Sequence, residues 1–201
     1  MADSRTWLNV EPLAEGAWCT GPVPFDGDTL LLEDRSLLID GPSPVPCCQW
    51  TGTLANPDDP PLTWIEQGWQ RLEELLPSCS SGGLLRPHAQ HLASDVPSTR
   101  LLIEKTAPLG LGLGLGPASM LVPSMLEDAH DHLVRLLEGL GPACSMVLLE
   151  DLDESGGPVI AGQGILPGKL LGELIAEHVP VNVPVVASGS SIEHVLDWLE
   201  A

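Results

Sequence analysis

The sequence predicts an α/β or α+β fold: a mixed, partly parallel sheet flanked by helices, with a β-rich N-terminal portion. Three observations support this prediction. Apolar runs alternate with segments of helical periodicity over residues 99–201, as in proteins whose parallel strands are joined by helices. Residues 1–60 carry short apolar runs separated by proline-rich links. Hydrophobic residues make up 43% of the 201 residues, which is enough to fill a packed core.

Strands and a hairpin are predicted in the N-terminal portion. Residues 6–10 and 47–54 are short apolar stretches, and each is expected to form a strand. In residues 28–41 two apolar runs, Leu30–Leu32 and Leu37–Ile39, lie on either side of a polar pair. This pattern predicts a tight β-hairpin.

A helix is predicted over residues 62–76, where Thr63 and Glu66 match a capping box and apolar residues follow at helical spacing. A polar stretch with glycines and prolines comes after it and indicates a loop. The expected organisation is an N-terminal portion at 1–80, a connecting loop at 81–98 and an α/β portion at 99–201, with one domain over 1–201 as the alternative.

The α/β portion is organised around Thr99–Asp153, which has the order of apolar run, glycine-rich segment, helical pattern and apolar run found in a βαβ unit. Residues 158–166 fit either a strand or a loop. The other expected elements are a strand at 100–105, a helix within 117–140, a strand at 145–150, a helix at 167–178, a strand at 183–187, and a last helix capped by Ser188–Ser191.

The glycine-rich segment is the strongest candidate for a cofactor site. Its glycines alternate with leucines after a predicted strand and before a predicted helix: Gly110, Gly112, Gly114 and Gly116. Glycines in this position let backbone N–H groups approach a phosphate at a helix N-terminus. Ser119 stands where a dinucleotide-binding pattern has its third glycine, and Asp151 ends the next strand, where a ribose-binding acid would lie.

Other features of this segment argue against a phosphate site. The pattern G-x-x-x-x-G-K-[ST] does not occur, and residues 110–116 contain no Lys or Arg. Bulky leucines occupy the alternate positions, so packing or contact with a partner is the competing interpretation. The residues expected at a protein contact are the three loop leucines and two tryptophans: Leu111, Leu113, Leu115, Trp64 and Trp69.

Charge and cysteine content limit the classes of partner. The formal net charge is −20, from 28 acidic and 8 basic residues, so the surface repels nucleic acid and anionic membranes. No apolar stretch is long and uninterrupted enough to predict a membrane span, and no secretory leader is recognised. The five cysteines are irregularly spaced, which indicates a reduced, intracellular protein, cytoplasmic or alternatively nuclear.

The sequence therefore favours a non-catalytic intracellular adaptor or complex subunit that binds another protein. No nucleophile or metal-ligand signature was recognised, and no cofactor or metal is expected. One alternative is a nucleotide- or dinucleotide-binding enzyme that uses the segment Gly110–Gly116. Another is a degenerate nucleotide-binding fold that keeps the βαβ frame and has lost the phosphate-binding lysine.

Overall fold

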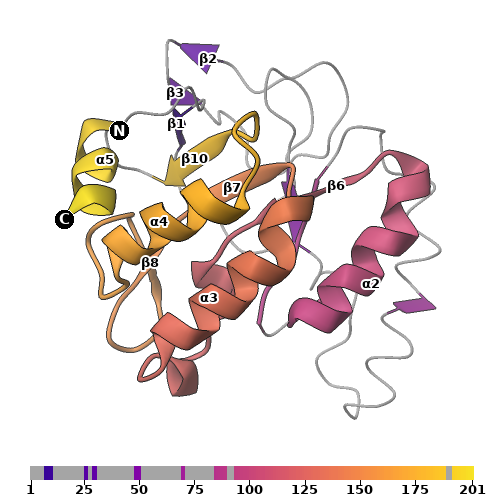
Figure 1. Ribbon diagram of the computed structural model, residues 1–201, viewed down its shortest axis with the longest axis horizontal. Helices are drawn as coiled ribbons and strands as arrows, with labels where there is room; N and C mark the ends of the chain where they lie inside the picture. Colours follow the sequence, from indigo (N-terminus) through magenta and orange to yellow (C-terminus); the bar gives the residue numbers. More distant parts are fainter. Residues whose placement is uncertain are drawn as a thin grey trace.

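The computed structural model describes residues 7–10, 25–26, 29–30, 48–50, 69–70, 84–89, 93–188 and 192–201. The described strands form an eight-stranded sheet in the order β2-β3-β1-β10-β7-β6-β5-β4 (Figure 1). These strands are β1 (Trp7–Val10), β2 (Phe25–Asp26), β3 (Thr29–Leu30), β4 (Cys48–Trp50), β5 (Leu84–Arg86), β6 (Gly112–Leu115), β7 (Met146–Leu149) and β10 (Val185–Ser188). A separate two-stranded hairpin pairs β8 (Asp151–Leu152) with β9 (Pro158–Val159).

Neighbouring strands of the large sheet are parallel, except for the antiparallel pair β2–β3. Five strands of the large sheet lie side by side in the order in which they occur along the chain: β4, β5, β6, β7 and β10. Since crossovers between parallel strands are almost always right-handed, a sheet that advances in one direction places its crossover helices on one face. A largely parallel sheet joined by helices confirms the predicted α/β fold class.

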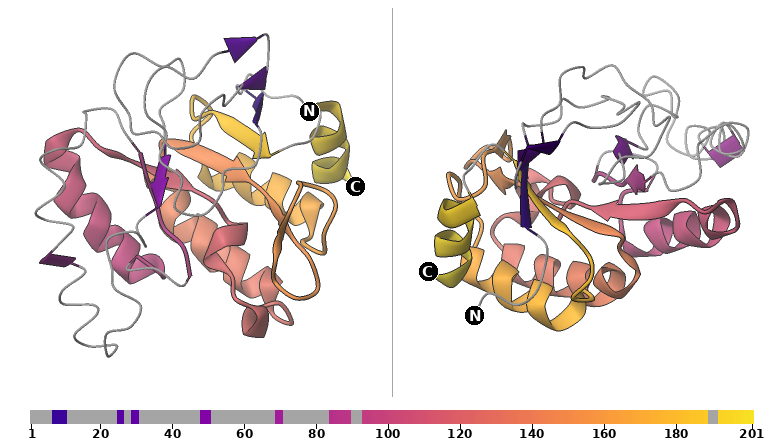
Figure 2. Two further views of the ribbon diagram at one scale, coloured as in Figure 1. Left: turned by 180° about the vertical axis from the view of Figure 1, so that it is seen from behind. Right: turned by 90° about the horizontal axis from the view of Figure 1, so that it is seen from above.

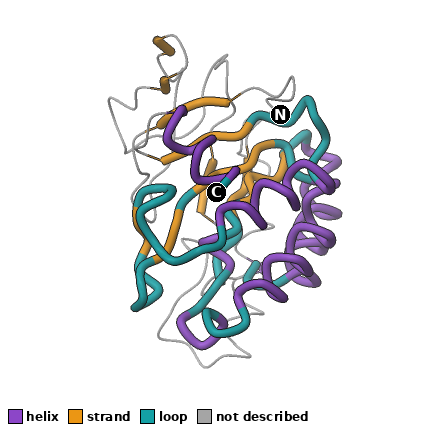
Figure 3. The backbone as a smooth tube through the Cα atoms, turned by 60° about the vertical axis from the view of Figure 1, so that its left-hand side comes forward, coloured by secondary structure: helices purple, strands orange, loops and turns teal. Residues whose placement is uncertain are grey.

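The crossover helices do lie on a common face of the sheet. They are α2 (Val96–Thr106), α3 (Ala129–Leu140) and α4 (Gly168–His178), with α3 between the other two (Figures 1 and 2). The C-terminal helix α5 (Ile192–Glu200) packs beside α4 and reaches β1. In Figure 3 the described helices lie together beside the strands, and loops join the ends of the two kinds of element. Single 3₁₀ turns occur at Ala107–Leu109, Ala118–Met120, Pro123–Met125 and Gly141–Ala143.

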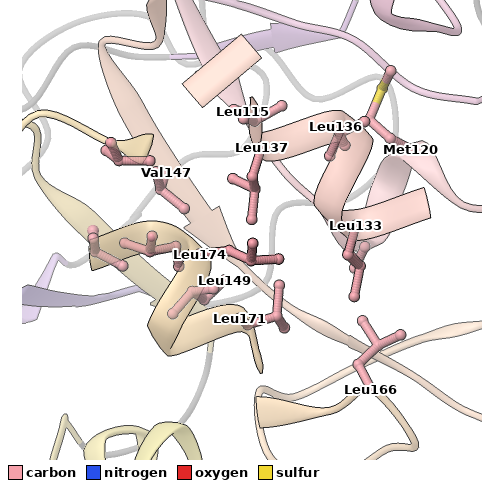
Figure 4. Packing of buried hydrophobic residues seen from close by; sticks show 14 of the residues in the cluster. Leu115, Met120, Leu133, Leu136, Leu137, Val147, Leu149, Leu166, Leu171 and Leu174 are labelled. Atoms are coloured by element: carbon pink, nitrogen blue, oxygen red, sulfur yellow. The ribbon is translucent and has the colours of Figure 1, made fainter. Parts of the chain in front are cut away.

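The main core fills the space between the sheet and this helical layer. Alternate strand residues point toward the helices because successive side chains of a strand point to opposite faces. The side chains that meet there include Leu115, Val147 and Leu149 from the strands, Leu133, Leu136 and Leu137 from α3, and Leu171 and Leu174 from α4 (Figure 4). At about 1.5–3 kcal/mol for each fully buried aliphatic side chain, this layer supplies much of the driving force for folding.

Glycines set the close approach of α4 and α5. A Cβ atom at Gly168 would lie 2.3 Å from the carbonyl oxygen of Trp198, and one at Gly172 would lie 2.8 Å from that of Leu199. Both contacts are with backbone, which cannot rotate away as a side chain can. The two helices pack at this distance because α4 has glycine at these two positions.

Several elements agree with the sequence prediction. The strands at 6–10, 47–54, 145–150 and 183–187 correspond to β1, β4, β7 and β10, and the three predicted C-terminal helices correspond to α3, α4 and α5. Of residues 158–166 only Pro158–Val159 form a strand. Trp69 and Gln70 are helical, as predicted, but the rest of the 62–76 helix lies outside the described residues.

Two predictions in the centre of the chain are wrong. Residues 100–105 form part of helix α2 and not a strand, because Asp95 and Ser98 cap a helix there through reciprocal side-chain to backbone hydrogen bonds. The predicted loop at 81–98 contains strand β5.

Of the predicted hairpin at 28–41, only Thr29 and Leu30 are described. They pair antiparallel with Phe25–Asp26, which precede the predicted hairpin, so this pairing is not the predicted one. Residues 31–39, which include most of the predicted hairpin, lie outside the described residues.

Candidate functional site

Polar side chains meet at the carboxyl ends of β5, β6 and β7. Arg86 is the last residue of β5, and Glu150 directly follows β7. The guanidinium Nη2 of Arg86 forms a charge-assisted hydrogen bond with Oε2 of Glu150. Because β6 lies between β5 and β7, this ion pair crosses the end of the intervening strand. In parallel α/β sheets and barrels this edge is where binding and catalytic residues gather.

Gly116 makes room for this crossing. A Cβ atom at Gly116 would lie 3.1 Å from Nη2 and 3.3 Å from Nε of Arg86, and 2.8 Å from Oγ of Ser119. A larger residue after β6 would therefore displace the arginine side chain from its path to Glu150. The glycine is required by a neighbouring side chain and not by an unusual backbone angle.

Two loops at this edge are joined by Ser119. Its hydroxyl lies 2.8 Å from the carbonyl oxygen of Gly116 and 3.3 Å from that of Pro87, so it donates to one of these acceptors at a time. Its own carbonyl oxygen accepts a hydrogen bond from the Ala89 N–H at 2.9 Å. The segments that follow β5 and β6 are thereby tied together beneath the ion pair.

The Arg86–Glu150 pair is largely removed from water. The side chain of Arg86 is 1% exposed and that of Glu150 is 12% exposed. Charges at such positions have lost most of their hydration, and the ion pair replaces part of the stabilisation that water would give. The pair braces β5 against β7, and only the carboxylate keeps some access to solvent.

The glycine-rich segment does not form the loop that the phosphate-site prediction requires. Gly112–Leu115 is strand β6, in register with β5 and β7 on its two sides. Its alternation of glycine and leucine follows the two-residue period of a strand. Gly112 and Gly114 share a face with Leu84 and Met146, whereas the intervening leucines point into the helical side of the sheet.

The sequence-predicted glycines therefore occupy different environments. Gly110 is exposed, with a φ angle of 72° that suits glycine, at the end of the turn after α2. A Cβ atom at Gly112 would lie 2.5 Å from Oγ of Ser145 and 2.7 Å from Cδ2 of Leu84. At Gly112 and Gly116, neighbouring side chains thus occupy the space beside the backbone that a phosphate would need.

Asp151, the predicted ribose-binding acid, is fully buried and serves its own loop. Its carboxylate oxygens accept hydrogen bonds from the backbone N–H groups of Leu152, Gly164 and Leu166, at 2.8, 2.8 and 2.9 Å. The sequence could not indicate these partners, because two of them lie 13 and 15 residues further along the chain.

The predicted contact leucines are not available at the surface. Leu111, Leu113 and Leu115 are 7%, 1% and 0% exposed, because they point into the two apolar clusters beside the helices. That part of the prediction is wrong. Trp69 is half-buried against the cluster that contains Leu111, with the Lys105 ammonium 6.0 Å from its ring centroid. Trp64 lies outside the described residues.

Arg86 was missed by sequence reasoning. It lay inside a segment interpreted as a loop, where a basic residue is unremarkable. The available signal was the run Leu84-Leu85-Arg86-Pro87, in which an apolar pair is ended by a charge and a proline, as at the end of a buried strand.

The hairpin β8–β9 extends from the same edge and ends in an acidic turn. Oδ1 of Asp153 accepts hydrogen bonds from the Ser155 hydroxyl, the Ser155 N–H and the Gly157 N–H at 2.6, 2.8 and 2.9 Å. The Ser155 hydroxyl, followed by the Gly157 N–H, lowers the pKa of Asp153 below its ordinary value of 3.8.

The described residues contain neither a metal-ligand cluster nor a helix suited to a membrane span. No group of three or more His, Cys, Asp or Glu side chains is placed there to hold a metal ion. None of the helices described is long and apolar enough to cross a membrane.

Comparison with known proteins yields a resemblance of fold. No protein-family model and no curated protein sequence matches the chain. A xylose isomerase domain protein from Alicyclobacillus acidocaldarius subsp. acidocaldarius is 14% identical, with a TM-score of 0.44, over 76% of this chain and 61% of that one. The IOLI protein with a binding zinc atom is 12% identical, with a TM-score of 0.39, over 76% of this chain and 70% of that one. The chain thus spans less than two thirds of the first structure's length, and these resemblances indicate no activity for it.

Proposed function

We propose that this chain is a non-catalytic adaptor or complex subunit that binds a basic surface of another protein. The observation that carries the proposal is the imbalance of charge on the described surface. Exposed basic side chains are Arg100, Arg135 and Lys169. Exposed carboxylates are Asp95, Glu104, Glu127, Asp128, Asp131, Glu138, Asp153, Glu154, Glu173, Glu177, Glu193, Asp197 and Glu200.

This distribution favours association with a positively charged protein. Like charges on one surface repel each other, and a basic partner relieves that repulsion while the long-range field accelerates its approach. The polar groups nearest the sheet's carboxyl edge are engaged with one another: Arg86 pairs with Glu150, and Asp151 accepts three backbone N–H groups. Their arrangement serves the scaffold, which suits a protein whose role is recognition.

The proposal is tested by isolating the tagged protein from its own cells and measuring its mass by native mass spectrometry. We expect a complex with a protein of high isoelectric point, whose affinity for the purified chain falls as salt is raised from 50 to 500 mM. Recovery of a lone monomer, or of a complex insensitive to salt, would overturn the proposal.

A small-ligand site at the carboxyl edge is the second candidate. It is favoured by the position of the Arg86–Glu150 pair at the ends of parallel strands, with the Glu150 carboxylate partly open to solvent. A ligand bound there would stabilise the folded chain by RT ln(1 + [L]/Kd), so the melting temperature would rise with the logarithm of the ligand concentration once that concentration exceeds Kd. A nucleotide or sugar whose effect is lost in Glu150→Gln but kept in the exposed control Glu154→Gln would favour this candidate over the first.

A further inference from the structure

The strand order of the large sheet returns to its starting point. β4, β5, β6, β7 and β10 lie side by side in chain order, and the strand beyond β10 is β1, the first strand described. β1 and β10 pair in parallel, from Trp7 with Val185 to Val10 with Ser188. In an open sheet that advances in one direction, the first and last strands lie at opposite ends. Parallel pairing between them is the arrangement of a barrel.

The direction in which the chain advances is also that of a barrel. From β1 to its parallel neighbour β3 the chain moves the same way across the sheet as it does from β4 to β10. Among the described parallel strands only the step from β3 to β4 differs, because it crosses the sheet from near one end to the other. If the two ends meet, this step becomes another short move in the common direction. All the crossovers between parallel strands then have the same hand.

The face of the sheet opposite the helices is buried and apolar. Leu84, Met146, Leu148 and Val186 point to it, because they alternate along their strands with residues that pack beside the helices. These four residues are only 2–4% exposed, although the crossover helices lie on the other face (Figure 2). A second layer of helices would require the direction of advance to reverse. The interior of a barrel buries this face without a reversal, because its strands turn their apolar side chains toward each other.

We propose that β2 and β4, the two end strands, pair with each other and close the sheet into an eight-stranded barrel. The Arg86–Glu150 pair then lies in the mouth formed by the carboxyl ends of the parallel strands, because Arg86 is in line with Leu84, and Glu150 with Met146 and Leu148, on the inner face. An eight-stranded barrel has an interior just wide enough for its own side chains or for one small ligand. The partly exposed Glu150 carboxylate is therefore open to a small molecule that donates a hydrogen bond, and not to a protein surface.

The test detects the strand pairing directly, by NMR of the full chain labelled uniformly with 13C and 15N. Nuclear Overhauser effects are measured between backbone protons of Phe25–Asp26 and those of Cys48–Trp50, the residues of β2 and β4. The control is the contact of β4 with β5, in which Cys48 is paired with Leu84. A second sample mixes labelled with unlabelled chain, so that an isotope filter separates contacts within one chain from contacts between copies.

We expect effects between β2 and β4 as strong as those of the β4–β5 control, all within one chain, since neighbouring strands lie ~4.8 Å apart. Control effects without any between β2 and β4 would overturn the barrel. Effects seen only between copies would mean that the two ends join separate chains, and would overturn it as well. Loss of the control effects would remove β4 from the end of the sheet, with the same consequence. None of these outcomes depends on the adaptor function, which uses carboxylates exposed on the helices.

Discussion

Removal of the Glu150 carboxylate is the most direct perturbation of the brace across β6. In Glu150→Ala the guanidinium of Arg86, which is 1% exposed, loses the carboxylate that it contacts across β6. Breaking a buried pair from one side costs about 3–5 kcal/mol, because the remaining charge loses an interaction that replaced its hydration in a site with little water. The 12% exposure of Glu150 admits some solvent to the vacated position, so we expect a loss near the lower end, about 3 kcal/mol.

The measurement is the free energy of unfolding in urea, followed by far-ultraviolet circular dichroism. Glu154→Ala is the matched control, because it removes an exposed carboxylate a few residues away and should change stability by no more than ~0.5 kcal/mol. The double variant Arg86→Met with Glu150→Leu removes both charges and should recover most of the loss, since apolar replacement of a buried pair is often close to neutral.

Two results would refute this reasoning. A loss below ~1 kcal/mol for Glu150→Ala would mean that the pair is hydrated like a surface ion pair. A double variant as unstable as the sum of the two single variants would mean that the residues act independently and do not form one brace. The slope of unfolding free energy against urea must stay constant for either comparison to hold.

Three further outcomes test the parts around this edge. Gly168→Ala should destabilise the chain by ~1–3 kcal/mol through contact with the Trp198 backbone, and a stabilisation in the urea measurement would contradict the close packing of α4 and α5. Asp151→Asn should cost ~2–4 kcal/mol and speed hydrogen exchange of its loop amides, whereas unchanged exchange would show that the loop does not depend on the carboxylate. Ser155→Ala should raise the pKa of Asp153 toward 3.8 in an NMR titration, and an unchanged pKa would exclude the hydroxyl as the main cause. The stability that this lowered pKa contributes is present above pH 3.8 and is lost as the pH falls through the folded-state pKa.

The fold class could be predicted because it depends on periodicity. The helical stripes of α3 and α5 and the branched run of β10 carry their periodicity locally, and each forms the expected element. Residues 100–105 lacked that clarity, since a short run such as Leu101–Ile103 fits either a strand or a helix turn. The capping box at Asp95 and Ser98 identifies this run as helical, but both residues lie in the segment 81–98 that was predicted to be a loop.

The candidate site could be predicted only in part, because its residues meet through tertiary contacts. Arg86 and Glu150 are 64 residues apart, and no local pattern relates them. Asp151 was predicted as a ribose-binding acid, and in the structure its carboxylate accepts hydrogen bonds from three backbone N–H groups. Two of these N–H groups, from Gly164 and Leu166, lie in residues 158–166, whose sequence fits either a strand or a loop.

Strand β6 shows why the glycine pattern was misinterpreted. Glycine weakens a strand on its own, so four glycines in alternation indicate a loop when they are read in isolation. In the sheet, Leu84 and Ser145 occupy the space beside Gly112, and Arg86 occupies the space beside Gly116. The glycines are therefore complementary to large or polar neighbours on β5 and before β7, and one of them permits the ion pair at the carboxyl edge. The same residues that resemble a phosphate loop in sequence are needed here to let a buried arginine reach its carboxylate.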